Sequence, residues 1–113
     1  MTARLWRAAF WAAAAFALVM ALSPHPVRLP SDPGDKVQHI IAFLTLGALG
    51  RMAYAKASGW ALLAGLSLFG AAIELLQGIP ALNRDSDPVD WIADTVAAGI
   101  VILALNRLRR GRG

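Results

Sequence analysis

Three short polar groups contain the residue types that could do chemistry in this 113-residue chain. The first, residues 35–39, places an acid and a histidine four positions apart, on one face of a helix. The second, residues 74–77, places a glutamate and a glutamine on one helical face, and the third, residues 84–94, repeats aspartates at three- and four-residue spacings. We expect one polar site from these groups, with the candidate residues Asp35, Lys36, His39, Glu74, Gln77, Arg84, Asp90 and Asp94.

Two kinds of chemistry suit a histidine among carboxylates. His39 could act as a general base, because the pKa of imidazole lies near neutrality. Together with the carboxylates it could also hold a hard divalent cation through oxygen atoms. However, the chain has no H-E-x-x-H motif, its other histidine, His25, lies in a proline-rich loop, and no serine lies in a nucleophile-like turn. We therefore predict no metal and no cofactor, and keep a metal-assisted membrane hydrolase as an alternative.

Helix capping explains part of the polar pattern without any ligand. Asp35 and Gln38 resemble a capping box, and Asp87 precedes Pro88, which suits the first position of a helix. Asp90 then falls in the first turn, where the helix dipole favours an acid. Capping could thus account for Asp35, Gln38 and Asp87, and for Asp90 in part.

Capping does not explain His39, Glu74 or Asp94. Glu74 follows an apolar run that begins at Trp60, so it lies near the C-terminal end of a predicted helix. The helix dipole disfavours a negative charge at that end. A carboxylate costs about 2.5–3.5 kcal/mol at the centre of a membrane helix and less near its end. Two interpretations stay open: a polar network that only locks the helices together, or a binding or catalytic site.

Composition indicates a membrane protein. Hydrophobic residues make up 58% of the chain and charged residues only 16%, against about 25% charged in soluble domains. The apolar residues form four blocks at about 5–22, 36–55, 60–77 and 88–105, and a helix of that length reaches roughly 25–30 Å, about one hydrocarbon thickness. The sequence predicts an all-α fold: one membrane domain, residues 1–113, with four transmembrane helices. It has no cysteine, which excludes disulfides, thiolate metal sites and a cysteine nucleophile.

The first apolar block could instead be a signal peptide, because residues 21–23 resemble a cleavage site. Pro24 directly afterwards is a poor context for cleavage, so we expect an uncleaved span. Ala13, Ala17 and Ala21 repeat every four residues in this block, which allows close helix approach.

The basic residues predict the orientation of the bundle. Four alternating spans place on one side Arg4, Arg7, Arg51, Lys56, Arg107, Arg109, Arg110 and Arg112, and on the other only Arg28, Lys36 and Arg84. The positive-inside rule then puts both termini in the cytoplasm, in a multi-pass protein of the cytoplasmic (inner) membrane. The net charge of +4 is thereby explained by topology and by anionic membrane lipids, and we expect no nucleic-acid partner.

The order of the polar residues resembles that of the VanZ-like family of small bacterial integral membrane proteins. The resemblance covers about residues 35–105 and rests on Asp35-Lys36-x-x-His39, Glu74-x-x-Gln77, Pro80, Arg84, Asp90 and Asp94-x-x-x-x-Gly99. One departure is Asp94, where many members have asparagine.

The resemblance implies a cell-envelope protein acting at the outer membrane face. The family takes its name from a protein linked to resistance to the glycopeptide teicoplanin, so the implied partner is a lipid-linked envelope precursor or a glycopeptide. The resemblance does not establish an enzyme. A third alternative is a structural or interaction protein whose polar cluster only locks the helices, and helices rich in glycine and alanine also allow a homo-oligomer.

Overall fold

Four helices form the computed structural model, which describes residues 2–23, 34–79 and 88–111, without the side chains of 34–36, 110 and 111. The helices are α1 (Ala3–Leu22), α2 (Gly34–Ala53), α3 (Gly59–Gln77) and α4 (Pro88–Gly111). These described parts of the chain contain no strand, which confirms the all-α class. The helices overlie the four predicted spans, although α4 continues past residue 105 to Gly111.

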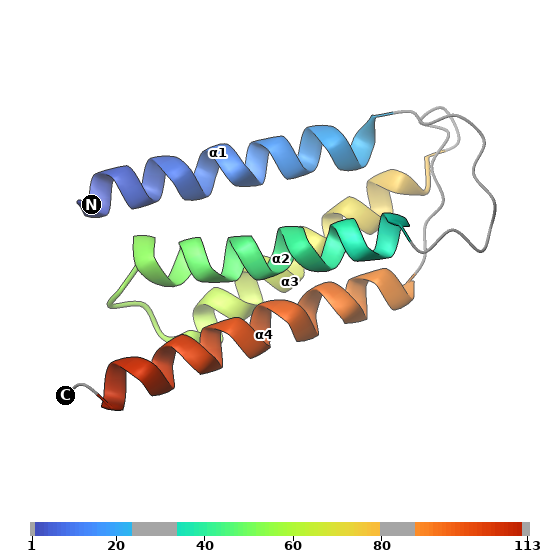
Figure 1. Ribbon diagram of the computed structural model, residues 1–113. Helices are drawn as coiled ribbons and strands as arrows, with labels where there is room; N and C mark the ends of the chain where they lie inside the picture. Colours follow the sequence, from blue (N-terminus) through green and yellow to red (C-terminus); the bar gives the residue numbers. More distant parts are fainter. Residues whose placement is uncertain (1, 24–33, 80–87, 112–113) are drawn as a thin grey trace.

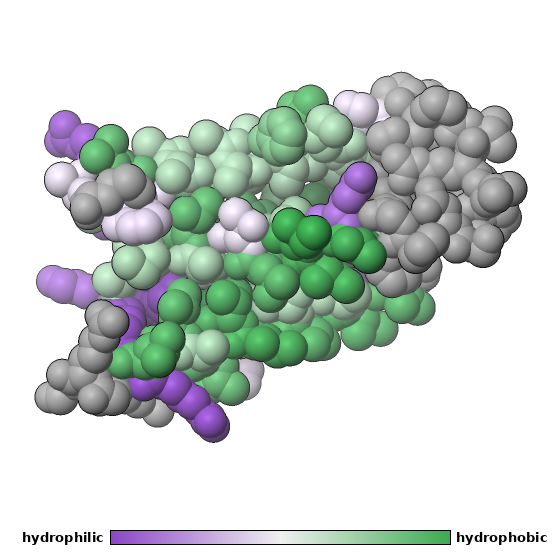
Figure 2. All heavy atoms as spheres, viewed as in Figure 1, coloured by the Kyte–Doolittle hydropathy of each residue, from purple (hydrophilic) through white to green (hydrophobic). Residues whose placement is uncertain are grey.

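Neighbouring helices along the chain run in opposite directions, so α2 and α4 run in the same direction (Figure 1). As a result, α1 begins and α4 ends at one end of the bundle, which we call the basic end. Figure 2 shows hydrophilic residues gathered there, while apolar residues cover the length of the visible face. The polar groups Asp35–His39 and Glu74–Gln77 lie toward the opposite end, where α2 begins and α3 ends.

Three helical segments are long and apolar enough to cross a membrane: Ala3–Leu22, Gly59–Gln77 and Pro88–Arg109. The described apolar part of α2 runs from Val37 to Ala53. Large apolar side chains point outward along the bundle, among them Phe16, Leu68 and Leu75, which are 68%, 71% and 79% exposed. An outer surface of this kind is suited to lipid and not to water, so the fold suggests a membrane protein, as predicted.

Helices α2 and α4 approach each other closely at Gly47. A methyl group built on Gly47 would overlap Cγ1 of Val101 and lie 3.3 Å from the carbonyl oxygen of Ala98, which is completely buried. Gly50, one turn later, faces α1 instead, where an added methyl group would lie 3.2 Å from the ring of Phe10. Glycine at these positions lets α2 pack tightly between two neighbours.

Arg51 joins α2 to α4 nearer the basic end. It is only 3% exposed, and its Nη1 donates a hydrogen bond of 3.1 Å to Oδ1 of Asn106 in α4. Its Nη2 donates to the carbonyl oxygens of Tyr54 and Ala55 at 2.8 and 3.0 Å and also to that of Ala57. The guanidinium thus satisfies backbone carbonyls after the last turn of α2, which have no partner within the helix.

We predict that Gly47→Ala destabilises the bundle and that Gly65→Ala does not. The added methyl group at position 47 overpacks the α2–α4 contact, at a cost of about 1–3 kcal/mol. Nothing lies within 4 Å of a methyl group at Gly65, so that variant should be neutral or slightly stabilised. Unfolding titrations of both variants in detergent micelles measure the difference, and equal midpoints for the two would contradict the packing described here.

We also predict that Arg51→Lys lowers the free energy of unfolding by about 2 kcal/mol. The single ammonium group of lysine cannot contact both Asn106 and the backbone carbonyl oxygens at the end of α2. The matched control is Arg107→Lys, at an exposed position of α4. Chemical denaturation of both variants checks the prediction. An Arg51→Lys protein as stable as the control would show that the guanidinium contacts are dispensable.

Candidate functional site

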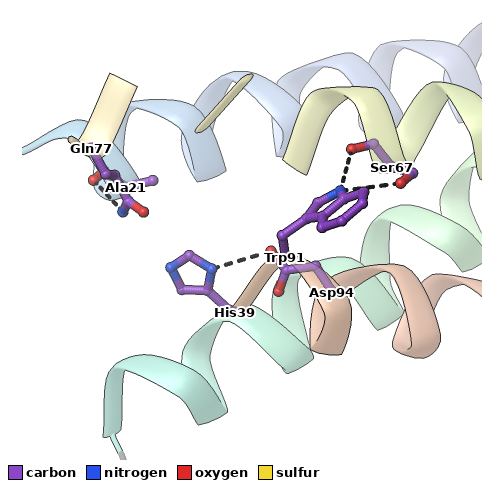
Figure 3. A network of polar contacts seen from close by, with 6 residues as sticks. All are labelled: Ala21, His39, Ser67, Gln77, Trp91 and Asp94. Atoms are coloured by element: carbon purple, nitrogen blue, oxygen red, sulfur yellow. Dashed lines mark hydrogen bonds and ion pairs between the residues drawn. The ribbon is translucent and has the colours of Figure 1, made fainter. Parts of the chain in front are cut away.

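His39 and Asp94 meet in the buried contact between α2 and α4. His39 Nδ1 lies 3.3 Å from Oδ2 of Asp94, and the two side chains are 8% and 0% exposed. If Asp94 is ionised, it can only accept a hydrogen bond, and Nδ1 of His39 is then the donor in this contact. The other ring nitrogen of His39 faces away from Asp94 (Figure 3).

Glu74 and Asp90 complete a compact group around His39. One ligand atom of each of the three residues lies within 4.8 Å of the others, and all three residues are buried. The group draws on three helices, because His39 belongs to α2, Glu74 to α3 and Asp90 to the first turn of α4. We call His39, Glu74, Asp90 and Asp94 the polar cluster. Imidazole and carboxylate oxygen are donors that suit a divalent cation.

Charge is the dominant property of the polar cluster. Its three carboxylates are at most 7% exposed, and buried negative charges are costly unless positive groups or hydrogen-bond donors face them. Two of the candidate residues, Lys36 and Arg84, are basic. Arg84 lies outside the described residues, as do the side chains of Lys36 and Asp35, so their assignment to the site stays a prediction.

Gln77, the remaining candidate, joins α3 to α1. It is 1% exposed, and its Nε2 donates a hydrogen bond of 2.9 Å to the carbonyl oxygen of Ala21 (Figure 3). That carbonyl lies in the last turn of α1, where backbone acceptors have no partner within the helix. The amide of Gln77 therefore has a structural task that its spacing from Glu74 did not reveal.

Two other polar residues, which the sequence patterns did not single out, join α3 to α4. Ser67 and Thr95 hydroxyls lie 3.0 Å apart. The indole Nε1 of Trp91 donates to the carbonyl oxygen of Ser67 at 2.9 Å and also lies 3.2 Å from its hydroxyl oxygen (Figure 3). This contact holds α4 beside α3 about one turn from Asp94, and so it supports the wall of the polar cluster.

A cavity of about 480 Å³ adjoins the polar cluster at His39. It lies mainly between α1 and α2, bordered by Ala13, Ala17 and Ala21 on the first helix and by residues between Gln38 and Leu46 on the second. Its lining is mostly apolar, and His39 belongs both to this lining and to the polar cluster. The sequence did not predict the cavity, because it arises from the way two separate helices pack.

Comparisons with protein-family models, with curated proteins and with solved structures give no match for this chain. The resemblance to the VanZ-like family therefore rests on the residues quoted above.

We predict that Asp94→Ala lowers stability more than Asp94→Asn. The amide oxygen of asparagine can still accept a hydrogen bond from His39 Nδ1, whereas alanine leaves a buried donor without that acceptor, at a cost of about 1–3 kcal/mol. Unfolding titrations in micelles compare the two. Equal loss in both variants would mean that the charge of Asp94, and not its hydrogen bond to His39, is what the fold requires.

Proposed function

We propose that this is a four-span protein of the cytoplasmic membrane, with both termini inside, that binds a lipid-linked or glycopeptide-type molecule at its outer face. The observation that carries the proposal is the polar cluster, where one histidine and three carboxylates from three helices converge beside an apolar cavity. The concentration of arginines at the basic end supports the orientation, because cytoplasmic ends are enriched in basic residues.

A purely structural role explains the polar cluster less well. The helices are already joined by neutral or singly charged contacts, namely Arg51 to Asn106, Gln77 to Ala21 and Trp91 to Ser67. Buried ionic groups add little stability compared with well-packed apolar residues. Burying three carboxylates costs free energy, and the contacts named above already join the helices without them. Binding of a ligand would account for their presence.

The charge of the polar cluster indicates the chemistry that it recognises. Carboxylate oxygens accept hydrogen bonds, and they do so more strongly at a buried site than on a surface. Groups rich in N–H and O–H donors, such as sugar hydroxyls and ammonium groups, are complementary to such a site. Lipid-linked sugars and glycopeptides carry these donors, which agrees with the partner that the family resemblance implies.

A second candidate function is metal-assisted hydrolysis, favoured by the close grouping of His39, Glu74 and Asp90. Asp94 would orient the imidazole, as second-shell carboxylates do for metal-bound histidines. A divalent cation would supply Lewis-acid activation there. Elemental analysis of the purified protein, with Glu74→Gln as the comparison, tests this alternative: a stoichiometric metal that the variant loses would favour it over simple binding.

We predict that His39→Ala, Glu74→Ala and Asp94→Ala each weaken binding of teicoplanin, or of a polyprenyl-linked aminosugar, about tenfold or more, which is about 1.4 kcal/mol. Lys56→Ala, which changes an exposed polar residue at the basic end, should bind as the unaltered protein does. Thermophoresis with purified protein in micelles measures the affinities, and unfolding titrations show whether the variants are folded.

Two results would count against this proposal. If the unaltered protein binds neither compound, lipid-linked and glycopeptide-type molecules are excluded as its ligands. Loss of binding that only parallels loss of folded protein in all three variants would make the polar cluster a structural network.

A further inference from the structure

The cavity beside His39 has the dimensions of a ligand site. Its volume of about 480 Å³ falls within the roughly 300–1,000 Å³ typical of small-molecule sites. Ala13 and Ala17 border it from α1, so the space is left by small side chains in the middle of that helix. Near its ends, α1 is held to the rest of the bundle by Arg7 Nε, which donates to the carbonyl oxygen of Ala53 at 3.1 Å, and by the contact between Gln77 and Ala21.

Polarity is distributed unevenly along the cavity. Its polar lining residues are His39 and Gln38, in adjacent positions near the start of α2, and Thr45. The hydroxyl of Thr45 donates to the carbonyl oxygen of Ile41 in its own helix at 2.8 Å, so it is already satisfied. The remaining lining is apolar. A long apolar space with one polar end is complementary to an amphiphile that has one chain and one head group.

The cavity opens onto the outer surface of the bundle. Three of its lining residues are also exposed on the outer surface: Phe16 and Met20 on α1, 68% and 49% exposed, and Ile41 on α2, 57% exposed. In the membrane orientation proposed above, lipid hydrocarbon surrounds this surface. A helix from a second copy, about 10–12 Å across with its side chains, is too wide to enter between two helices that already contact each other. A single hydrocarbon chain is not.

We propose that this cavity holds one hydrocarbon chain of a membrane lipid, which enters sideways between α1 and α2 and brings the lipid head group to His39. The inference rests on the proposed function for the role of the polar cluster, but it adds a separate site with its own residues. With lateral entry the lipid does not have to leave the bilayer. Its chain moves from one apolar environment to another, and its head group stays at the membrane surface.

The test compares two double variants of α1 that carry the same substitutions. Ala13→Leu with Ala17→Leu fills the cavity with side-chain carbon, whereas Ala12→Leu with Ala15→Leu adds the same atoms at exposed positions outside it. Each full-length protein is equilibrated with vesicles of equal parts phosphatidylethanolamine and phosphatidylglycerol, released in mild detergent and weighed by native mass spectrometry. We expect unaltered protein and the exposed-face variant to retain one lipid per chain, and the cavity variant to retain about tenfold less.

Other outcomes overturn the inference. Equal lipid retention by the two double variants would show that the cavity does not hold the chain, and a dimer lost only from the cavity variant would make the occupant a second copy. If the α1 cavity variant does not fold, Thr45→Phe fills the space from α2, with Leu44→Phe as its control outside the lining.

The same experiment separates this inference from the proposed function. Lipid retention lost in the cavity variant but kept in His39→Ala would support the chain site and contradict the contact between the head group and His39, while the binding of teicoplanin or the aminosugar tests the proposed function separately. Retention lost in His39→Ala but kept in the cavity variant would do the reverse.

Discussion

Polar groups inside an apolar bundle must find their partners within the protein, and this constraint fixes how α2 and α4 lie together. His39 contacts Asp94 at one level and Arg51 contacts Asn106 at another, and both pairs are separated by 55 residues in the chain. An equal separation at two levels is what two parallel, neighbouring helices require. Between these levels Gly47 removes the side chain that would keep the helices apart. The register of α2 against α4 is therefore set at two points and tightened between them.

The contact between α1 and α2 is built differently. Near the basic end, the indole Nε1 of Trp11 donates to the hydroxyl of Tyr54 at 2.8 Å, and the guanidinium of Arg7 lies 5.0 Å from the centre of the Tyr54 ring. Alanines occupy the stretch beyond them, and there the two helices leave a cavity. The bundle thus has one tight helix contact, between α2 and α4, and one looser contact, between α1 and α2, that leaves a cavity.

Much of this arrangement could be predicted from the sequence, because two simple rules carry it. Helical spacing places Asp90 and Asp94 on one stripe, and the alternation of spans brings His39, Glu74 and Asp94 to one end of the bundle. The roles of two residues could not be predicted in this way. Arg51 was interpreted as a topological charge, yet it is buried at the end of α2, and Gln77 contacts a backbone carbonyl of α1.

The cavity could not be predicted for a related reason. Helices that are apolar on nearly every side have no polar face to show which side turns inward, so the sequence does not specify which residues of α1 face α2. The repeat of Ala13, Ala17 and Ala21 predicted close approach of helices. In the structure these residues pack in or against the core, and they also form one wall of the space next to His39. The alanine spacing alone does not indicate such a space, which depends on the packing of the whole bundle.

The combination of cavity and polar cluster has an energetic consequence that neither has alone. The carboxylates of Glu74, Asp90 and Asp94 lose their water on folding, because each is at most 7% exposed. Because folding already removes this water, hydrogen bonds to these carboxylates form in a medium of low polarity, where hydrogen bonds to charged groups are strongest. The apolar chain adds little net energy on moving from lipid into the cavity, since both are hydrocarbon-like. In the proposed chain site, affinity would therefore come from the head group and orientation from the chain.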